Sequence, residues 1–406
     1  MQGAEFPPKG EQYCGDAVIP RDGTAVHTTE GKKMDVEEII GFDALFDSMI
    51  KCLKGVTWKD TPALFMHYWA REIRKLEKEL HDGTYRERKG RYFTITEPTV
   101  RVIKSVAFRD RIYQRSLNDV AIYPAVTKSF IYDNHACQKG KGTRKARERM
   151  ECFLHRFYRH HGADGYVLKC DIKGYYPNMR HDVAKEVLRK YLDAEVFKMA
   201  ADILDNFPGE VGFNPGSQIV QIVGLAALNG MDHYIKEQLG IKYYQRTTDD
   251  FILICESKEK LEHCLECIKK ILAAMHMELN PKKTKILKLK DGFKYLGFYY
   301  FLTDSGKVFI SIDPKKVKHE RRKLRRMAAL VKKGEKSKEK VDEHYESWKV
   351  HASYGNSYKL IKRMDEFYES LWKEDDNADQ ETKRNSKGNP GAGTDGGEDG
   401  AAGSSS

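Results

Sequence analysis

The sequence lacks any apolar run long enough to cross a membrane. No run approaches the roughly 18 residues that a membrane-spanning helix needs, and the N-terminus has no hydrophobic core of a secretion signal. Cysteine is sparse: of the eight, only Cys264 and Cys267 have the CxxC spacing, and no second pair accompanies them. A zinc site or a disulfide scaffold is therefore disfavoured. We expect a cytoplasmic protein with reduced thiols and no membrane partner.

Two common catalytic arrangements are missing as well. No Ser or Cys nucleophile belongs to a convincing triad, and the Gly-rich residues 139–142, which read KGKG, lack the Walker A spacing of a nucleotide P-loop. Gly140 and Gly142 permit close backbone approach, and a cationic helix is predicted from about Thr143. This segment therefore favours contact with phosphates of a nucleic-acid backbone.

Positive charge is in excess, and the excess is uneven. Charged residues make up 32% of the chain and the net charge is +11. Residues 374–406 contain eight acidic and three basic side chains, a balance of −5, so residues 1–373 carry +16. A basic folded body favours a polyanionic partner, and nucleic acid is the first candidate. The alternative is a basic protein without such a partner.

Two adjacent aspartates, Asp249 and Asp250, stand between two runs of strand-forming residues. Residues 243–254 read YYQRTTDDFILI, a pattern that predicts a strand, a tight polar turn and a second strand. Two carboxylates at a hairpin tip raise each other's pKa unless a cation neutralises them. Mg²⁺ is the economical neutraliser, because it takes oxygen ligands and leaves room for phosphate oxygens.

A third carboxylate, Asp171, ends the apolar run YVLKCD at residues 166–171. An aspartate there is costly unless it is paired or bound to a metal. If the two strands are neighbours in one sheet, Asp171, Asp249 and Asp250 converge. Such carboxylates hold two Mg²⁺ ions, with Mn²⁺ as an alternative, in two-metal phosphoryl transfer.

Hydrophobic periodicity predicts helices alternating with short strands. We expect one helix that ends near Pro124, another that begins at about residue 143, and a buried strand over 166–176. The other expected helices lie at 35–54, 61–80, 186–197, 218–239 and 258–277, with three more within 313–373.

Seven motifs, in order between Ile73 and Trp372, carry a family resemblance. They are RVIKSVAFRDRIYQ, YDNHACQKGKGT, DIKGYY, GSQIVQ, TTDD, LNPKKT and FKYLGF. The chain resembles a bacterial reverse transcriptase of the retron, group II intron and diversity-generating retroelement superfamily. The resemblance implies an α+β right-hand polymerase, with fingers and palm (an antiparallel sheet backed by helices) over 35–312 and a helical thumb over 313–373. Residues 1–34 and 374–406 are expected to be disordered or extended by composition.

The same resemblance implies roles for individual residues. Asp171, Asp249 and Asp250 are the expected catalytic metal ligands. Tyr176 falls where the family places a steric gate against a 2′-hydroxyl, and Arg101, Gln221 and Lys283 are the other expected nucleotide-binding residues. A packed structural tyrosine is the alternative for Tyr176. The expected nucleic-acid contacts are Arg109, Arg111, Lys139, Lys141, Arg144, Phe293, Tyr295, Gly297, Arg321, Arg322 and Arg325.

Three positions depart from the family pattern. Thr247 stands where most members have an aromatic residue, two positions before the paired aspartates. In the segment before the palm helix, Gln221 favours the SQ-motif group of the superfamily, whereas Pro215 and Val220 fit neither common pattern. These departures bear on primer support and fidelity.

We therefore expect an RNA-directed DNA polymerase that extends a primer 3′-hydroxyl. Its expected partners are an RNA template, a DNA primer, dNTPs and an accessory protein, and no membrane is expected as a partner. Two alternatives stay open: a catalytically silent RNA-binding protein of the same fold, and a defence-type polymerase with protein-primed or untemplated synthesis.

Overall fold

The computed structural model describes residues 34–96, 100–214 and 216–385, with side chains described as far as Lys373. The chain forms two compact units. The first comprises the residues up to Leu296 together with Phe301–Val308, and the second comprises Gly297–Tyr300 together with the residues from Phe309 on. No helix in the described ranges is both long and apolar enough to cross a membrane. The predictions for residues 1–33 and for Pro215 lie outside the described residues.

Four short helices open the first unit where two long ones were predicted. Gly41 has an extended backbone (φ −65°, ψ 159°), so the segment predicted as one helix from 35 to 54 is interrupted there. The Phe42 N–H beyond the break donates to Glu77 Oε1 at 3.0 Å. The second predicted helix is interrupted at Tyr68, which is not helical either. The four helices are α1 (Glu37–Ile40), α2 (Phe42–Leu53), α3 (Asp60–His67) and α4 (Trp69–His81).

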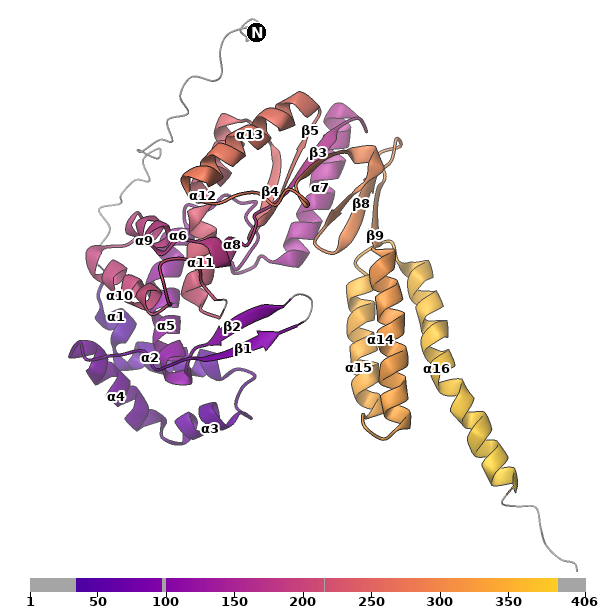
Figure 1. Cartoon of the computed structure of the whole chain (residues 1–406), viewed down its shortest axis with the longest axis horizontal. Coiled ribbons are helices and arrows are strands. Elements are labelled where there is room, and N and C mark those ends of the chain that lie inside the picture. The colour runs from indigo at the N-terminus through magenta and orange to yellow at the C-terminus, as the bar shows by residue number, and fades with distance from the viewer. Residues whose placement is uncertain (1–33, 97–99, 215, 386–406) are drawn as a thin grey trace, which may run out of the picture. The chain divides into compact units, whose positions relative to one another are not determined.

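A two-stranded antiparallel ribbon follows, and a buried lysine anchors it. Strand β1 (Arg91–Ile95) pairs with β2 (Arg101–Ser105), and the ribbon projects from the neighbouring helices in Figure 1. Lys104 Nζ lies 2.9 Å from Glu87 Oε1, with both side chains about 5% exposed. Gly216 approaches β2 so closely that an added Cβ would lie 2.1 Å from the Lys104 carbonyl oxygen. Only glycine fits at that position.

The helix after β2 continues past Pro124, where it was predicted to end. Residues Asn118–Ile122 form a π-helical turn (η1) between α5 (Phe108–Leu117) and α6 (Tyr123–Thr127). Pro124 stands in the first turn of α6, where its missing N–H is tolerated.

A four-stranded sheet forms the centre of the first unit. Its order is β4–β5–β3–β6, and every neighbouring pair is antiparallel. The predicted hairpin at residues 243–254 is confirmed as β4 and β5. The strand predicted over 166–176 ends at Asp171, and the residues after it form a short helix, α8 (Tyr175–Asn178). The strands are β3 (Tyr166–Asp171), β4 (Tyr243–Thr247), β5 (Asp250–Cys255) and β6 (Lys285–Lys288).

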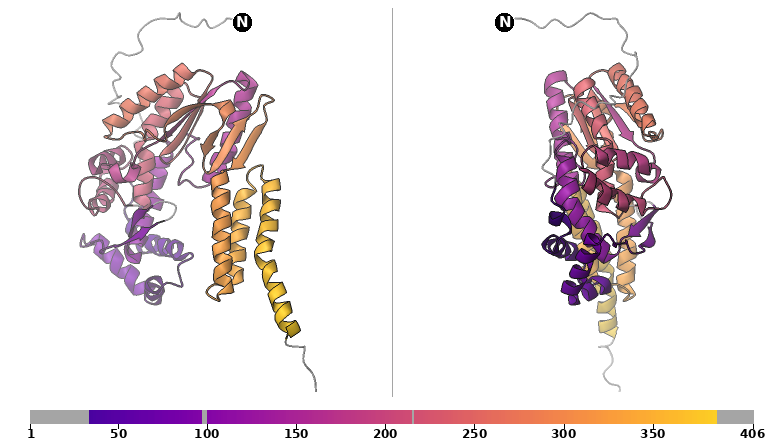
Figure 2. Two further views of the ribbon diagram at one scale, coloured as in Figure 1. Left: turned by 45° about the vertical axis from the view of Figure 1, so that its right-hand side comes forward. Right: turned by 90° about the vertical axis from the view of Figure 1, so that its left-hand side faces the viewer.

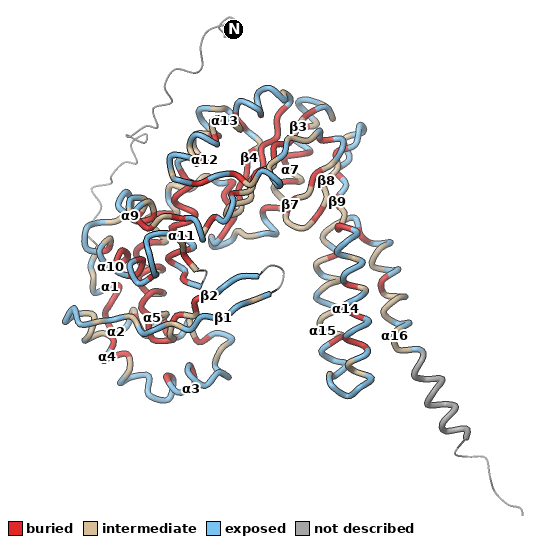
Figure 3. Tube along the Cα trace, in the orientation of Figure 1, coloured by how far each residue is buried: buried red, intermediate tan, exposed pale blue. Residues whose placement is uncertain are grey.

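Helices cover both faces of this sheet, as the views in Figure 2 show. Neighbouring residues of β4 point to opposite faces: Gln245 donates to the Ala146 carbonyl of α7 (Thr143–His161), whereas Tyr244 bonds Asp232 of α12 (Asn229–His233). Figure 3 shows the central strands as buried. The remaining helical segments on the α12 side are α11 (Gln218–Ala227), η2 (Tyr234–Gln238) and α13 (Lys258–Ala274).

The helix predicted over 186–197 is two helices, α9 (His181–Arg189) and α10 (Ala194–Asp205). Asp193 causes the restart, because its side chain caps α10 by accepting from the amides of Glu195 and Val196 at 3.1 and 2.9 Å.

The second unit is mainly helical. Strands β7 (Phe293–Tyr295), β8 (Phe298–Leu302) and β9 (Val308–Ile312) form a three-stranded sheet in that order, whose residues are divided between the two units. Three helices of the second unit follow. Leu324, Val341, Tyr345 and Met364 form the core between the helices. The helices are α14 (Pro314–Lys332), α15 (Lys338–Ala352) and α16 (Tyr358–Asn385). Helix α16 therefore extends beyond residue 373, the predicted end of the helical unit.

Candidate active site

Three aspartates meet at one end of the four-stranded sheet. Asp171, the last residue of β3, is the direct cross-strand partner of Asp250, the first residue of β5. Asp249 occupies the adjoining turn, and its carbonyl oxygen accepts from the Ile172 N–H at 3.3 Å. The hairpin and β3 thus bring together carboxylates separated by nearly eighty residues in the sequence.

Burial of these carboxylates sets their electrostatics. Burial raises the pKa of Asp250 to about 6, and the neighbouring Asp171 and Asp249 add to the rise while Lys169 opposes it. Burial likewise raises the pKa of Asp249, whereas Lys283 and Arg101 lower it. The negative charge gathered here is therefore incompletely neutralised by the protein itself.

A lysine ammonium occupies the place of a cation at Asp171. Lys283 Nζ lies 2.9 Å from Oδ1 and 3.1 Å from Oδ2 of Asp171. Asp250 Oδ1 is buried with no hydrogen-bond partner, and Lys169 Nζ lies 3.7 Å from it. Both observations fit carboxylates that a divalent cation would satisfy.

The three carboxylates are more widely spaced than a cage for one ion. Within the described part of the chain, the set of acidic or His ligand atoms that all lie within 4.8 Å of one another is Glu37, Glu77 and His81. Glu77 there is already bonded to the Phe42 amide and to Arg74, so that set is a capping cluster of α2. Lys283 contacts Asp171 and Lys169 contacts Asp250, so each lysine neutralises a different aspartate of the sheet.

The turn is fixed to β7 by a hydroxyl pair. Thr247 Oγ1 lies 3.0 Å from Tyr295 Oη, and Lys169 Nζ donates to the Lys294 carbonyl at 3.0 Å. Both contacts lie within the first unit. Thr248 has φ +60°, an uncommon conformation for a β-branched residue. The turn that presents Asp249 is thus held in a strained geometry by its surroundings.

Tyr176 lies on α8 against helix α11. Its ring is half-buried, and an added Cβ at Gly224 would lie 2.8 Å from Tyr176 Cε1. The hydroxyl of the preceding Tyr175 donates to the Gly224 carbonyl oxygen. On the same helix, Gln221 is exposed and its Oε1 accepts from the Cys137 thiol at 3.8 Å. Arg101 is exposed on β2, and its positive charge lowers the pKa of Asp249.

The family model for reverse transcriptase (RNA-dependent DNA polymerase) matches residues 89–300. That is more than half of the chain. The chain belongs to the reverse transcriptase family. The α+β architecture predicted from the motifs, a reverse transcriptase fold with antiparallel sheets and helices, is confirmed.

Other comparisons are distant. No curated protein gives a significant match. Similar solved structures include Candida albicans telomerase with a fragment of telomeric RNA (13% identity, 58% of this chain and 49% of that chain, TM-score 0.42). Apo telomerase from Candida tropicalis is another (14% identity, 60% of this chain and 52% of that chain, TM-score 0.45). The chain spans about half the length of these telomerase chains.

Three of the residues that we predicted to contact nucleic acid are buried in this reverse transcriptase. Arg109 is 5% exposed, its guanidinium donates to Glu79 at 2.5 and 3.2 Å, and Asp110 lies beside it. Phe293 and Tyr295 are also buried. These side chains pack the fingers and β7, and their contact with nucleic acid stays a prediction.

The other residues predicted to contact nucleic acid differ in whether their side chains already have partners within the protein. Lys139 and Arg144 are exposed, and Arg144 pairs with Glu148 at 2.9 Å. Lys141 donates to the carbonyls of Tyr132 and Asn134, and Arg111 to that of Val106. Gly297 has φ +92° in the turn after β7.

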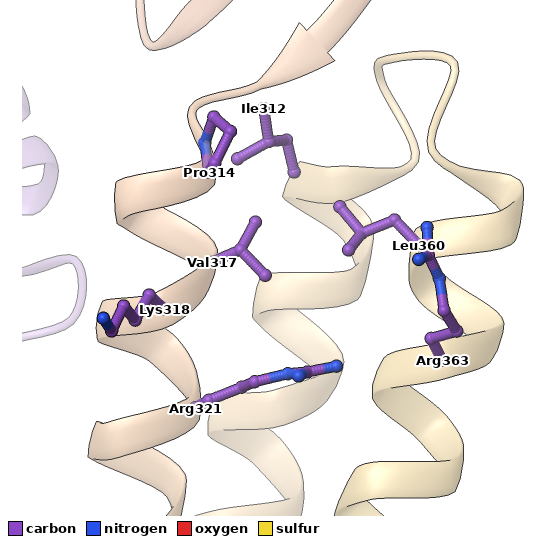
Figure 4. A pocket seen from close by; sticks show the side chains of 7 residues that line it. All are labelled: Ile312, Pro314, Val317, Lys318, Arg321, Leu360 and Arg363. Carbon is purple, nitrogen blue, oxygen red and sulfur yellow. The ribbon is translucent and has the colours of Figure 1, made fainter.

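In the second unit, the arginines of α14 divide between two surroundings. Arg322 and Arg325 are exposed and Arg321 is half-buried, and the guanidinium carbons of Arg321 and Arg325 lie 5.1 and 5.0 Å from the centre of the Phe367 ring. Figure 4 shows a pocket of this unit in which Arg321, Lys318 and Arg363 surround apolar side chains of α14 and α16.

Sequence reasoning missed a second group of residues at the site. Lys169 contacts Asp250, Arg246 and Asp232 support the hairpin that carries Asp249 and Asp250, and Gly224 faces the Tyr176 ring. The available signal was Arg246 itself, a charged residue within a predicted strand and two positions after Tyr244, so that both residues lie on the same face.

Proposed function

We propose that this protein is an RNA-directed DNA polymerase that extends a primer 3′-hydroxyl on an RNA template, as part of a bacterial or phage retroelement. The observation that carries the proposal is the convergence of Asp171, Asp249 and Asp250 in a chain of the reverse transcriptase family. The retroelement assignment rests on the motif set, and Gln221 favours the SQ-motif group within it.

The carboxylates suit a pair of Mg²⁺ ions, or Mn²⁺ in their place. When bound, such ions activate the attacking hydroxyl and stabilise the leaving pyrophosphate. In our proposal Asp171 and Asp249 are ligands of both ions, and Asp250 completes the site with its unpartnered Oδ1. A divalent cation at Asp171 would release Lys283, whose ammonium is then available to the pyrophosphate.

The nucleotide pocket is proposed from three side chains. Arg101 would grip the triphosphate, and Gln221 would lie beside the templating pair. Tyr176 would exclude the 2′-hydroxyl of a ribonucleotide. Support for this last role comes from Gly224, because the absence of a side chain there lets the Tyr176 ring pack flat against α11. Replacing Tyr176 by alanine should admit ribonucleotides, and unchanged dNTP/rNTP selectivity would return Tyr176 to a packing role.

Contact with template and primer is proposed for the exposed basic residues. Lys139 and Arg144 in the first unit and Arg322 in the second offer their charges to phosphates. Such contacts recognise backbone and shape more than base sequence.

The test is primer extension with purified protein. An RNA template, a DNA primer, dNTPs and Mg²⁺ should give full-length cDNA, and the Asp249→Asn variant should give none. If wild type and variant are equally inactive across Mg²⁺ and Mn²⁺ but both bind RNA, the silent RNA-binding alternative replaces the proposal. A product with protein at its 5′ end, or one that ignores the template, indicates the defence-type alternative.

A further inference from the structure

A fully buried arginine lies directly behind the turn that carries Asp249. Arg246 and Asp232 both have side-chain exposures of 0%. Arg246 Nε donates to Asp232 Oδ1 at 2.8 Å and Nη2 donates to Oδ2 at 2.5 Å, a bidentate pair. The Tyr244 hydroxyl also donates to Asp232. The carboxylate thus fixes the plane of the guanidinium.

The other guanidinium N–H groups are directed at two backbone carbonyls. Nη1 donates to the Thr248 carbonyl at 2.9 Å, and Nη2 donates to the Leu225 carbonyl at 3.0 Å. Thr248 immediately precedes Asp249 and has φ +60°. A β-branched residue is strained in this region, so a strong donor on its carbonyl opposes relaxation of the turn.

The second carbonyl belongs to the nucleotide side of the site. Leu225 follows Gly224, whose Cα faces the Tyr176 ring and whose carbonyl accepts from Tyr175. One planar group therefore joins the turn of the metal ligands to the helix that backs the proposed sugar gate. We propose that Arg246, oriented by Asp232, is a positioning residue that holds these two halves of the polymerase site in register.

The strand itself does not depend on this side chain. The Arg246 amide donates to the Asp133 carbonyl at 3.0 Å, and the His135 amide donates to the Arg246 carbonyl at 3.0 Å. Backbone pairing with β5 adds to these bonds. Moreover, a buried ion pair is often no more stabilising than apolar side chains of the same volume. We therefore expect the Arg246 guanidinium to fix the position of the Asp249 turn relative to α11 rather than to raise the stability of the fold.

The matched test is Arg246→Lys beside Arg149→Lys. Lysine keeps the charge opposite Asp232, but one ammonium cannot span both carbonyls. Arg149 also pairs with a buried aspartate, Asp133, at 2.6 Å, yet it does not touch the turn. We expect Arg246→Lys to lower kcat by about 10- to 100-fold and to weaken Mn²⁺ binding several-fold, measured by electron paramagnetic resonance on protein without nucleic acid. Arg149→Lys should change neither.

A double variant separates positioning from folding. Arg246→Met with Asp232→Leu removes both charges, and we expect it to keep the melting temperature of Arg246→Lys or better while showing the same loss of Mn²⁺ affinity. Wild-type Mn²⁺ affinity in Arg246→Lys and in the double variant would overturn the inference. So would losses that follow the melting temperature and appear equally in Arg149→Lys.

The inference rests on the proposed polymerase function, but the two fail differently. If wild-type protein makes no cDNA, the proposed function fails, whereas the Mn²⁺ titrations still decide whether Arg246 positions the carboxylates.

Discussion

Two antiparallel hairpins carry Arg101 and the Asp249–Asp250 pair, and they are built in opposite ways. The β4–β5 hairpin is buried along most of its length. Hydrogen bonds at the Thr247 hydroxyl, the Thr248 carbonyl and the Asp249 carbonyl hold the Asp249 turn in place. The β1–β2 ribbon is mostly exposed, with Tyr92 and Phe93 each about half accessible. Its buried anchor, Lys104, stands near the base of the ribbon.

The difference indicates a division of labour. Metal ligands must keep a fixed spacing through catalysis, and the surroundings of β4–β5 provide that. A residue that grips an incoming triphosphate must let substrate enter and pyrophosphate leave, and a ribbon anchored at one end permits such movement. Changes at Asp249 should therefore abolish chemistry, whereas changes at Arg101 should mainly weaken binding.

The largest effect is expected for Asp249→Asn. Loss of one carboxylate charge removes a ligand at the centre of the proposed metal site, so kcat should fall on the order of 10³-fold. Single-turnover primer extension measures this. The control is Asp182→Asn, because Asp182 is an exposed aspartate paired only locally with Arg180. Equal activity of the two variants would remove Asp249 from the chemistry.

Arg101→Ala sharpens the contrast between the hairpins. A charge-assisted hydrogen bond to a triphosphate is worth roughly 1.5–3 kcal/mol, so KM for dNTP should rise about ten- to a hundred-fold while kcat changes little. The control, Arg91→Ala, removes an exposed arginine from the same ribbon. Steady-state kinetics that show a fall in kcat without a change in KM would contradict a gripping role.

The metal-free protein should lose stability as pH rises from about 4 to above 6. The pKa of Asp250 is raised to about 6 in the fold, so the folded state binds a proton that the unfolded state has released. The melting temperature in EDTA should fall by a few degrees over this range, and Mg²⁺ should reverse the fall at pH 7. Thermal scans of Asp250→Asn should show a weaker dependence on pH, and an unchanged slope would show that other groups cause it.

The smallest effect is expected for Thr247→Val. It removes the hydroxyl pair with Tyr295 at nearly constant volume, at a cost of about 1 kcal/mol. The melting temperature should drop by about 2 °C, with activity within a few-fold of wild type. Tyr295→Phe removes the same bond from the other side, so the two changes should not be additive in a double-mutant cycle.

The sequence contained enough to place the aspartates but not to place everything around them. The Asp-Asp turn and the aspartate at the end of an apolar strand are local signals, and strand pairing then brought Asp171 opposite Asp250. Helix interruptions at Gly41 and Tyr68 were missed because hydrophobic periodicity continues through both breaks.

Burial of charged side chains was the feature that the sequence indicated least. Arg109 lies in a basic segment that resembles a contact surface, yet Glu79, thirty residues earlier, draws its guanidinium inside. Arg246 is the converse case: its partner Asp232 lies on α12, and only the folded chain shows that the pair supports the turn. Pairing between distant charges cannot be inferred from either local segment.

The most direct test of the central claim is a crystal structure of the protein with Mn²⁺ and a primer–template, with anomalous scattering used to locate the metal. We predict manganese peaks bound by Asp171 and Asp249, with the Lys283 ammonium displaced from Asp171. Absence of metal at these carboxylates, with Lys283 still bonded to Asp171, would contradict it.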